Sequence, residues 1–409
     1  MTTAVHPCAP ATLAARTGPP PEPRGVDRLP VALAGVAILA FALFLWTGVD
    51  LRKAGLFLIG GALGVTLYHA AFGFTGGWRA FIAHRDGRGL RAQLLAFALA
   101  MLVFLPLLAE GTVFGRGVGG AVAPVGVSVL IGAFLFGLGM QLGGGCGSGT
   151  LFTVGGGNAR MVVTLVFFVV GAVVGTLHLP WWLTLPSYGS QSLLKLWGLG
   201  PALAAQLAAL ALIAALTLWL ERRHHGGPAP EPAHKLHGAA RFLRGPWPIL
   251  WGAVGLAAFN AATLAVAGHP WSITFAFGLW GAKALSLAGV AVNEWAFWTW
   301  PFPSRALAAP LWADTTTVMN VGILLGAMLA AGLAGRFAPR ARIPVPSLIA
   351  AVLGGLMMGY GARLAFGCNI GALFSGIASG SLHAWLWFAA AFVGSIVGVR
   401  LRPLFRLET

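Results

Sequence analysis

The chain has 409 residues, of which 58% are hydrophobic and only 9% are charged, and its mean hydropathy is +0.83. Because a soluble domain carries roughly 25% charged residues, this composition excludes an ordinary water-soluble protein and favours a bilayer crossed by apolar helices. The net charge of +16 comes from basic residues clustered between apolar stretches, at 79–91, 222–244, 336–342 and 400–406. That distribution is typical of cytoplasmic loops and argues against nucleic-acid binding.

The first 28 residues are rich in proline and include Cys8. No basic start runs directly into an apolar core, so the segment does not match a signal peptide. We predict a disordered cytoplasmic tail, 1–28, in which Cys8 has no role.

Apolar stretches able to cross a bilayer then follow in chain order. They lie near 30–49, 54–76, 92–113, 121–142, 161–178, 201–220, 247–267, 272–292, 317–335, 346–366 and 383–399. Residues 221–246 are polar, basic and rich in proline and glycine, which predicts a cytoplasmic linker between two membrane halves. The halves are 29–220 and 247–402, and a short tail, 403–409, follows.

The positions of the basic loops limit how many of these eleven apolar stretches can cross the membrane. If they are cytoplasmic, ten crossings with both termini in the cytoplasm require that 272–292 is re-entrant or broken. We therefore predict an all-α, polytopic helical membrane protein with about ten spans plus re-entrant or broken half-helices.

Two glycine-rich segments in the two halves match one another. Residues 132–152 align with 354–374 at a constant shift of 222, and both copies precede an apolar stretch with a G-x-x-x-G pattern, at 171–175 and 394–398. The identical pairs include Gly132/Gly354, Gly137/Gly359, Gly139/Gly361, Leu142/Leu364, Gly145/Gly367, Cys146/Cys368, Gly149/Gly371, Leu151/Leu373 and Phe152/Phe374. The basic loops make the copies antiparallel, which predicts inverted pseudo-twofold repeats with a site near the bilayer midplane.

The first copy contains GGGCGSGTLF, residues 143–152. It is not a phosphate-binding loop, because Thr150 stands where that motif requires lysine and no strand precedes it. Irregular backbone inside a bilayer needs protein or water around it, and the freed N–H groups of the following half-helix can bind an anion. We predict such a pathway at both copies. Its candidate residues are Cys146, Cys368, Gly145, Gly147, Gly149, Gly367, Gly371 and Asn369, with Gln141 and Arg363 at equivalent positions five residues before each cysteine.

The cysteines bear on which anion would bind. A phosphate or carboxylate site usually recruits Arg or Lys, whereas a thiol is a weak donor and a soft, polarizable partner. This favours a soft sulfur anion. Two alternatives stay open: a glycine-packed scaffold whose cysteines are small hydrophobes, and a membrane sulfurtransferase that forms a cysteine persulfide. The second lacks a histidine or carboxylate beside either motif.

Other polar residues receive structural interpretations. We expect an ion pair among Lys283, Glu294 and Asp314, packing roles for His69 and His383, and a helix cap at Asn158. No His, Cys, Asp and Glu cluster has metal-ligand spacing, and no nucleotide motif is visible. The sequence therefore predicts a transporter without a catalytic residue, metal or cofactor.

The motifs GMQLGGGCGSGTLF (139–152) and GYGARLAFGCNIGALFSGI (359–377) resemble the paired Gly-Cys motifs of the YeeE/YedE membrane proteins. Segments 61–81, 279–298 and 314–331 are also similar, so the resemblance covers about 54 to 402. It implies an inner-membrane protein that takes up thiosulfate or a related inorganic sulfur anion, and it makes a cytosolic sulfur-carrier protein a plausible partner.

By matching motif, the family's pathway cysteines are Cys146 and Cys368 here. The sequence departs from the family at one place, because many members carry a third cysteine where this chain has Gly73. That difference leaves related sulfur or selenium species open as substrates.

Overall fold

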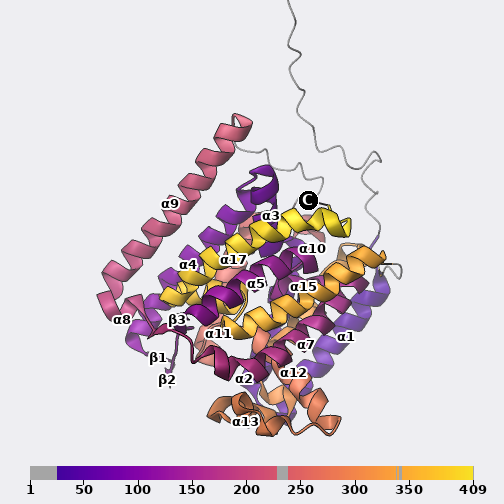
Figure 1. Cartoon of the computed structure of the whole chain (residues 1–409). Helices are drawn as coiled ribbons and strands as arrows, with labels where there is room; N and C mark the ends of the chain where they lie inside the picture. Colours follow the sequence, from indigo (N-terminus) through magenta and orange to yellow (C-terminus); the bar gives the residue numbers. More distant parts are fainter. Residues whose placement is uncertain (1–24, 228–237, 338, 340–342, 409) are drawn as a thin grey trace, which may run out of the picture.

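The computed structural model describes residues 25–227, 238–337, 339 and 343–408. Most of the predicted N-terminal tail, with Cys8, and residues 228–237 of the predicted linker lie outside the described residues. Within the described part, ten helical segments are long and apolar enough to cross a membrane (Figure 1). The chain is therefore a polytopic helical membrane protein, as its composition predicts.

The first half consists of helices and four short strands. Its helices are α1 (Arg28–Gly48), α2 (Leu51–His69), α3 (Phe74–His84), α4 (Arg88–Glu110), α5 (Val127–Gly143), α6 (Gly147–Gly155), α7 (Ala159–Trp182), α8 (Leu193–Trp197) and α9 (Leu199–His225). Its strands form two antiparallel pairs, β1 (Thr112–Val113) with β2 (Arg116–Gly117) and β3 (Pro124–Gly126) with β4 (Ser187–Ser190).

The second half consists of helices and connecting loops in its described part. Its α-helices are α10 (Gly238–Arg244), α11 (Ile249–Ala267), α12 (Thr274–Leu287), α13 (Pro301–Ala308), α14 (Thr315–Leu333), α15 (Val345–Leu364), α16 (Ser375–Ala378) and α17 (Leu382–Leu401). Tighter or wider turns are η1 (Val292–Glu294), η2 (Ala296–Thr299), η3 (Leu311–Ala313), the π-helical η4 (Asn369–Phe374) and η5 (Arg402–Phe405).

Each half contains the same series of six helical segments: long, short, long, long, short, long. The series α2 to α7 corresponds to α11, α12, α14, α15, η4 with α16, and α17. The packing repeats as well, because α2 packs on α14 as α11 packs on α4, and α5 packs on α17 as α15 packs on α7. Exchanging the two halves therefore preserves the contacts, which confirms the predicted repeat.

Glycines at equivalent positions make these contacts. A Cβ atom added at Gly137 would collide with the backbone carbonyl of Ala391, and one at Gly359 would collide with that of Phe168. A Cβ at Gly354 would likewise collide with the backbone of Gly143. Small residues let membrane helices approach closely. Because Gly143 at the end of α5 lies against Gly354 in the middle of α15, while Gly132 near the start of α5 lies against Leu364 at the end of α15, the two Gly-Cys copies are antiparallel, as predicted.

Two faces of the bundle carry the ends of these helices. On the face that we call the basic face, Tyr68, Arg160, Arg336 and Ser347 line a cavity of about 480 Å³. The opposite face carries a second cavity, of about 680 Å³, lined by Lys53, His269 and Asp314 among others.

The first residues after position 220 belong to α9, which continues to His225, so the predicted linker begins inside a helix.

Helices α1 and α9 lie outside the repeats. Both present long apolar side chains outward, including Leu39 and Leu212, which are exposed. Figure 1 shows α9 at the edge of the bundle, with its N-terminal end near α8. Such a surface suits contact with lipid, where an apolar helix face needs no protein partner.

Two predicted spans have different boundaries in the structure. The stretch 54–76 is not one helix, because the chain breaks at 70–73, where Ala71 has a φ of 46°, and then starts α3. The predicted span therefore covers most of α2, which is long enough to cross a bilayer, together with the first residues of α3. The stretch 272–292 contains α12, whose 14 residues are too short to cross a bilayer, so the predicted interruption is confirmed.

Candidate functional site

Four half-helices begin in the interior of the bundle, two from each repeat. They are α3, α6, α12 and η4 with α16, and their N-cap residues are Gly73, Cys146, Ile273 and Cys368. The first two half-helices run toward the basic face and the other two toward the opposite face. All four N-termini therefore point into the middle of the molecule.

Contacts between these N-termini place them at one point. A Cβ atom at Gly147, the first residue of α6, would lie 3.0 Å from Cys368 Sγ and 3.5 Å from Ile273 Cγ2. The main chain of Phe74, the first residue of α3, contacts the Cys146 thiol, and the two thiols are close enough to interact electrostatically. We call this point the half-helix junction.

Both thiols at the junction are fully buried. Cys146 Sγ accepts a hydrogen bond from the Gly149 amide at 3.5 Å and lies 3.4 Å from Ser148 Oγ. Cys368 Sγ accepts from the Ile370 amide at 3.4 Å. Each sulfur thus accepts from an amide of its own half-helix, and a thiol can also donate its S–H hydrogen, which for Cys146 has Ser148 Oγ within reach.

Glycines shape the chain around each thiol. Gly144 ends α5 with a φ of 93°, and Gly367 precedes Cys368 with a φ of 151°, both in the region that favours glycine. A Cβ at Gly145 would lie 3.0 Å from the backbone of α6, and one at Gly371 would lie 3.0 Å from Ser272 Oγ. Gly149 has more room, because its nearest neighbour would be Cys146 Sγ at 3.5 Å. The predicted glycines therefore allow tight turns and close approach.

Several fully buried polar atoms near the junction lack a hydrogen-bond partner. Asn369, the first residue of η4, has neither side-chain Nδ2 nor Oδ1 bonded. Thr75 and Thr150, in the first turns of α3 and α6, have unpartnered hydroxyls. Because burying an unpaired polar group costs free energy, this concentration of unpaired groups fits a place where a polar ligand binds. The sequence motifs pointed to Asn369 but not to the two threonines.

Gln141 and Arg363 occupy equivalent places beside the half-helices. Gln141 Nε2 donates to the Thr75 carbonyl of α3 at 3.3 Å, and its Oε1 is unpartnered. The Arg363 guanidinium lies over the ring of Phe275 of α12, at 5.8 Å, and over Phe297, at 4.8 Å. Each side chain thus contacts the other half-helix of its own repeat, and the cation of Arg363 rests on aromatic faces.

The expected ion pair among Lys283, Glu294 and Asp314 is wrong for the described part of the chain. Lys283 Nζ donates to the Leu307 carbonyl at 2.7 Å. The Asp314 carboxylate caps α14, where it accepts from the Thr317 amide at 2.7 Å. Nearby backbone groups thus satisfy the charges of Lys283 and Asp314. Sequence spacing alone does not show such contacts.

The other polar predictions have simpler outcomes. Asn158 caps α7 and accepts from the Met161 amide at 3.2 Å, as predicted. The His383 ring nitrogen lies 2.6 Å from Ser381 Oγ, and the His69 ring packs against Trp247. Among the described residues, no group of three His, Cys, Asp or Glu side chains could hold a metal ion.

The junction therefore combines two properties. Each half-helix N-terminus carries a partial positive charge and free backbone N–H groups, so four of them directed at one point favour an anion. The thiols add soft, weak hydrogen-bond donors without a fixed charge. Sequence reasoning found the two cysteine half-helices and the interruption at 272–292, but it did not place the N-termini of α3 and α12 at the site. The local signals there were the glycines of FGFTGG and the prolyl turn before Trp271.

Comparison with known proteins bears on this arrangement. The chain is 27% identical over 357 residues to the thiosulfate transporter TsuA of Spirochaeta thermophila, a match that covers 84% of this chain and 94% of the relative. It is 26% identical over 358 residues to TsuA of Escherichia coli, covering 84% and 91%. The probable transporter YedE of Escherichia coli is 37% identical over 147 residues, which is 35% of each chain. The aligned part thus spans about a third of the length of YedE.

A sequence profile described as sulphur transport matches residues 69–397, which include all four half-helices. The names of the family and of these relatives are those of transporters rather than enzymes. On the extent of that match, the chain belongs to the sulphur transport family of membrane proteins, which includes the YeeE/YedE proteins.

Proposed function

We propose that the protein carries thiosulfate or a related inorganic sulfur anion across the inner membrane through the half-helix junction. The observation that carries the proposal is the convergence of four half-helix N-termini on two buried thiols. The relatives that match most of the chain are named as thiosulfate transporters, in accord with this chemistry.

In this proposal the anion moves between equivalent sites of the two repeats. The N-termini offset its charge, while the S–H groups of Cys146 and Cys368 donate to its sulfur or oxygen atoms. Asn369 and Gln141 supply amide groups, and the surrounding glycines let the backbone approach. Weak donors suit transport, because a site must bind strongly enough to admit an ion and weakly enough to release it.

Arrangement in the cell is part of the same proposal. The basic face is cytoplasmic, since its loops are rich in arginine and lysine, and both termini lie on that side. The two membrane halves are joined by the cytoplasmic linker. Delivery of the anion to a cytosolic sulfur-carrier protein would take place at the basic face.

A membrane sulfurtransferase is the alternative. In that reaction a cysteine thiolate would attack the outer sulfur of thiosulfate, form a persulfide and release sulfite. Among the described residues, the hydrogen bonds of the two thiols go to Ser148 and to backbone amides, with no histidine or carboxylate as a base. Full burial without a base disfavours a thiolate, so transport is the better reading.

The test is uptake of labelled thiosulfate into liposomes that contain the purified protein. We expect Cys146→Ala and Cys368→Ala to lower uptake by at least tenfold while both variants stay folded, and Cys8→Ala, the matched control, to transport normally. Normal uptake by both motif variants would disprove the thiol pathway. Persulfide formation by a wild-type protein that carries no flux would instead support the enzyme.

A further inference from the structure

Two arginines bind the end of helix α5, directly before the turn that leads to Cys146. The last four carbonyl groups of a helix have no partner inside it, and the Gly144 amide satisfies only the first of the four in α5. Arg160 and Arg402 donate to the other three, at 141–143. We call this arrangement the arginine clamp.

Arg160 makes the larger contribution to the clamp. Its Nη2 donates to the Leu142 carbonyl at 2.7 Å and its Nη1 to the Gly143 carbonyl at 2.6 Å, so one planar guanidinium spans two consecutive carbonyls. Its Nε donates to Ser347 Oγ, at the start of α15, at 2.8 Å. Because Arg160 itself lies on α7, it joins three helices that come from both repeats.

The corresponding end of α15 has no arginine side chain bound to it within the part of the chain that the structure describes. The carbonyls of Ala362 and Leu364 accept from a backbone amide at 2.8 Å and from Ser128 Oγ at 2.7 Å. Arg160 is the second residue of α7, and the second residue of α17 is His383, whose ring bonds a serine hydroxyl two residues earlier. Neutral groups therefore close the end of α15, whereas cations close the end of α5.

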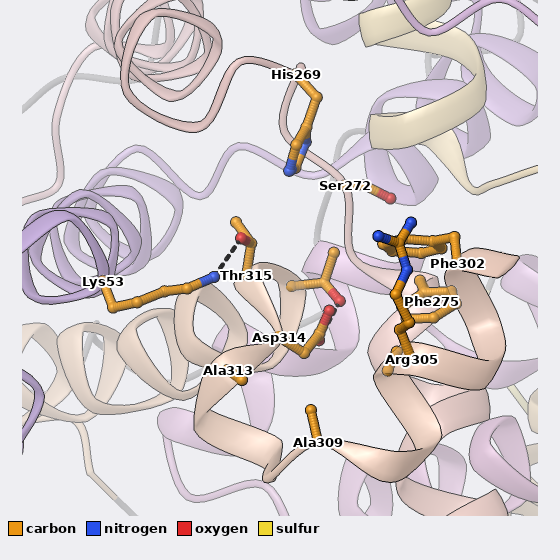
Figure 2. A pocket seen from close by; sticks show the side chains of 12 residues that line it. Lys53, His269, Ser272, Phe275, Phe302, Arg305, Ala309, Ala313, Asp314 and Thr315 are labelled. Carbon is orange, nitrogen blue, oxygen red and sulfur yellow. Dashed lines mark hydrogen bonds between the residues drawn. The ribbon is translucent and has the colours of Figure 1, made fainter. Parts of the chain in front are cut away.

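The cations of the opposite face do not replace the clamp. Figure 2 shows Lys53 and Arg305 at the cavity on that face. Lys53 Nζ donates to Thr315 Oγ1 at 2.8 Å, and Arg305 Nε donates to the Pro301 carbonyl at 3.0 Å, so neither hydrogen bond reaches α15. The arginine clamp is thus a feature of the basic face that departs from the symmetry of the two repeats.

The clamp affects both the charge and the geometry of the Cys146 turn. A helix C-terminus carries about half an elementary negative charge, which would repel an anion beside Cys146, and two guanidinium groups more than offset it. The bonds to Leu142 and Gly143 also hold the chain directly before Gly144, whose φ of 93° begins the turn. A Cβ atom on Gly144 would lie 2.6 Å from Arg160 Nη1, so the guanidinium packs directly on the turn.

We propose that Arg160 is a positioning residue of the transporter, whose forked bonds to the end of α5 hold the Cys146 thiol at the junction and so set the rate at which the anion passes from Cys146 to the basic face. The passage of the anion rests on the proposed function. The role needs the planar fork of arginine, because a lysine ammonium is a point charge on a flexible stem and does not hold two carbonyls in one plane. Substitution can therefore separate the charge from the fork.

Uptake kinetics test this role. Arg160→Lys and Arg160→Gln should each lower the maximal rate of thiosulfate uptake into liposomes at least fivefold and should not raise the half-saturating concentration, because binding from the opposite face does not involve the clamp. Arg336→Gln is the matched control, since it removes a cation that lines the same basic-face cavity as Arg160, and it should transport normally. A wild-type rate in Arg160→Lys would overturn the positioning role, because charge alone would then suffice.

The reactivity of the thiols gives a measurement that does not depend on flux. The chain has three cysteines, so Cys8→Ala with Cys368→Ala leaves Cys146 as the single thiol. Adding Arg160→Lys should raise the rate at which Cys146 reacts with methyl methanethiosulfonate, a small neutral reagent, at least fivefold. The same substitution should leave the rate of Cys368, alone in Cys8→Ala with Cys146→Ala, within twofold.

Two results of this measurement would refute the positioning role. One is an unchanged rate at Cys146, and the other is an equal rise at both thiols, which would show a general loosening of the fold. If the contrast between the thiols held while the wild-type protein carried no thiosulfate, the proposed function would fail and the clamp would stand.

Discussion

The sharpest test of the half-helix junction is a single methyl group at Gly147. Alanine at this position would place its Cβ atom 3.0 Å from Cys368 Sγ and 3.5 Å from Cys368 Cβ. Non-bonded carbon atoms favour about 3.5–4.0 Å, and sulfur is larger than carbon. The Cys368 thiol would therefore have to move by half an ångström or more.

The size of the effect follows from that overlap. Overpacking a tight interior costs about 1–3 kcal/mol, and the higher helix propensity of alanine offsets up to about 1 kcal/mol. We expect a net destabilisation of about 1–2 kcal/mol. The same displacement at the narrowest part of the pathway would raise the barrier for the anion by at least about 1.4 kcal/mol, which corresponds to a tenfold loss of flux.

Gly149→Ala is the matched control, since it adds the same methyl group two residues later in the same half-helix. Its Cβ would lie 3.5 Å from Cys146 Sγ, an ordinary contact, so stability should equal or exceed that of the wild type. Both variants would be compared by thermal unfolding in detergent and by thiosulfate uptake into liposomes. If Gly147→Ala matched the wild type in both assays, the two cysteine half-helices could not be in the close contact that we describe.

Three further predictions concern the fold and the first half-helix. Gly359→Ala should destabilise the protein by about 1–3 kcal/mol, because its Cβ would collide with the Phe168 carbonyl; Gly55→Ala, with nothing within 4 Å, should not, and equal melting temperatures would contradict the repeat packing. Asn158→Ala should cost about 1 kcal/mol through loss of the α7 cap, measured by thermal unfolding, and a neutral result would show that the cap is dispensable. Gly73→Cys should fold as well as the wild type, because a Cβ there meets nothing within 4 Å, and should transport at least as fast; impaired folding would show that this N-cap cannot accept the cysteine common in the family.

The sequence was sufficient to predict the main architecture. The constant shift between 132–152 and 354–374, together with the direction implied by basic loops, predicted antiparallel copies. In the structure, equivalent glycines of the two repeats lie against backbone carbonyls of the neighbouring helix: Gly137 against Ala391, and Gly359 against Phe168. The prediction succeeded because glycine spacing records where helix backbones touch.

Other parts of the site left no readable pattern. The break at 70–73 lies in mostly apolar sequence, with His69 directly before it and Thr75 after it, so hydropathy joined α2 to α3. Lys53 and Arg305 both line the cavity opposite the basic face although they are 252 positions apart in the chain, and from the sequence alone each would be interpreted as a surface charge. They come together only because α2 packs on α14 and the segment before α14 folds back over its start. Such juxtapositions depend on tertiary packing, which composition and spacing do not encode.

The position of Arg363 beside the junction has a mechanistic consequence. At the junction, the arginine of the second motif, Arg363, rests on the rings of Phe275 and Phe297 rather than pairing with a carboxylate. The positive charge of Arg363 is therefore not cancelled by an ion pair, and it adds to the attraction of the helix termini, whose effect falls off within about one turn. An anion that leaves the junction escapes the helix termini within a few ångströms, so the charge of Arg363 supplies the longer-range part of the attraction there.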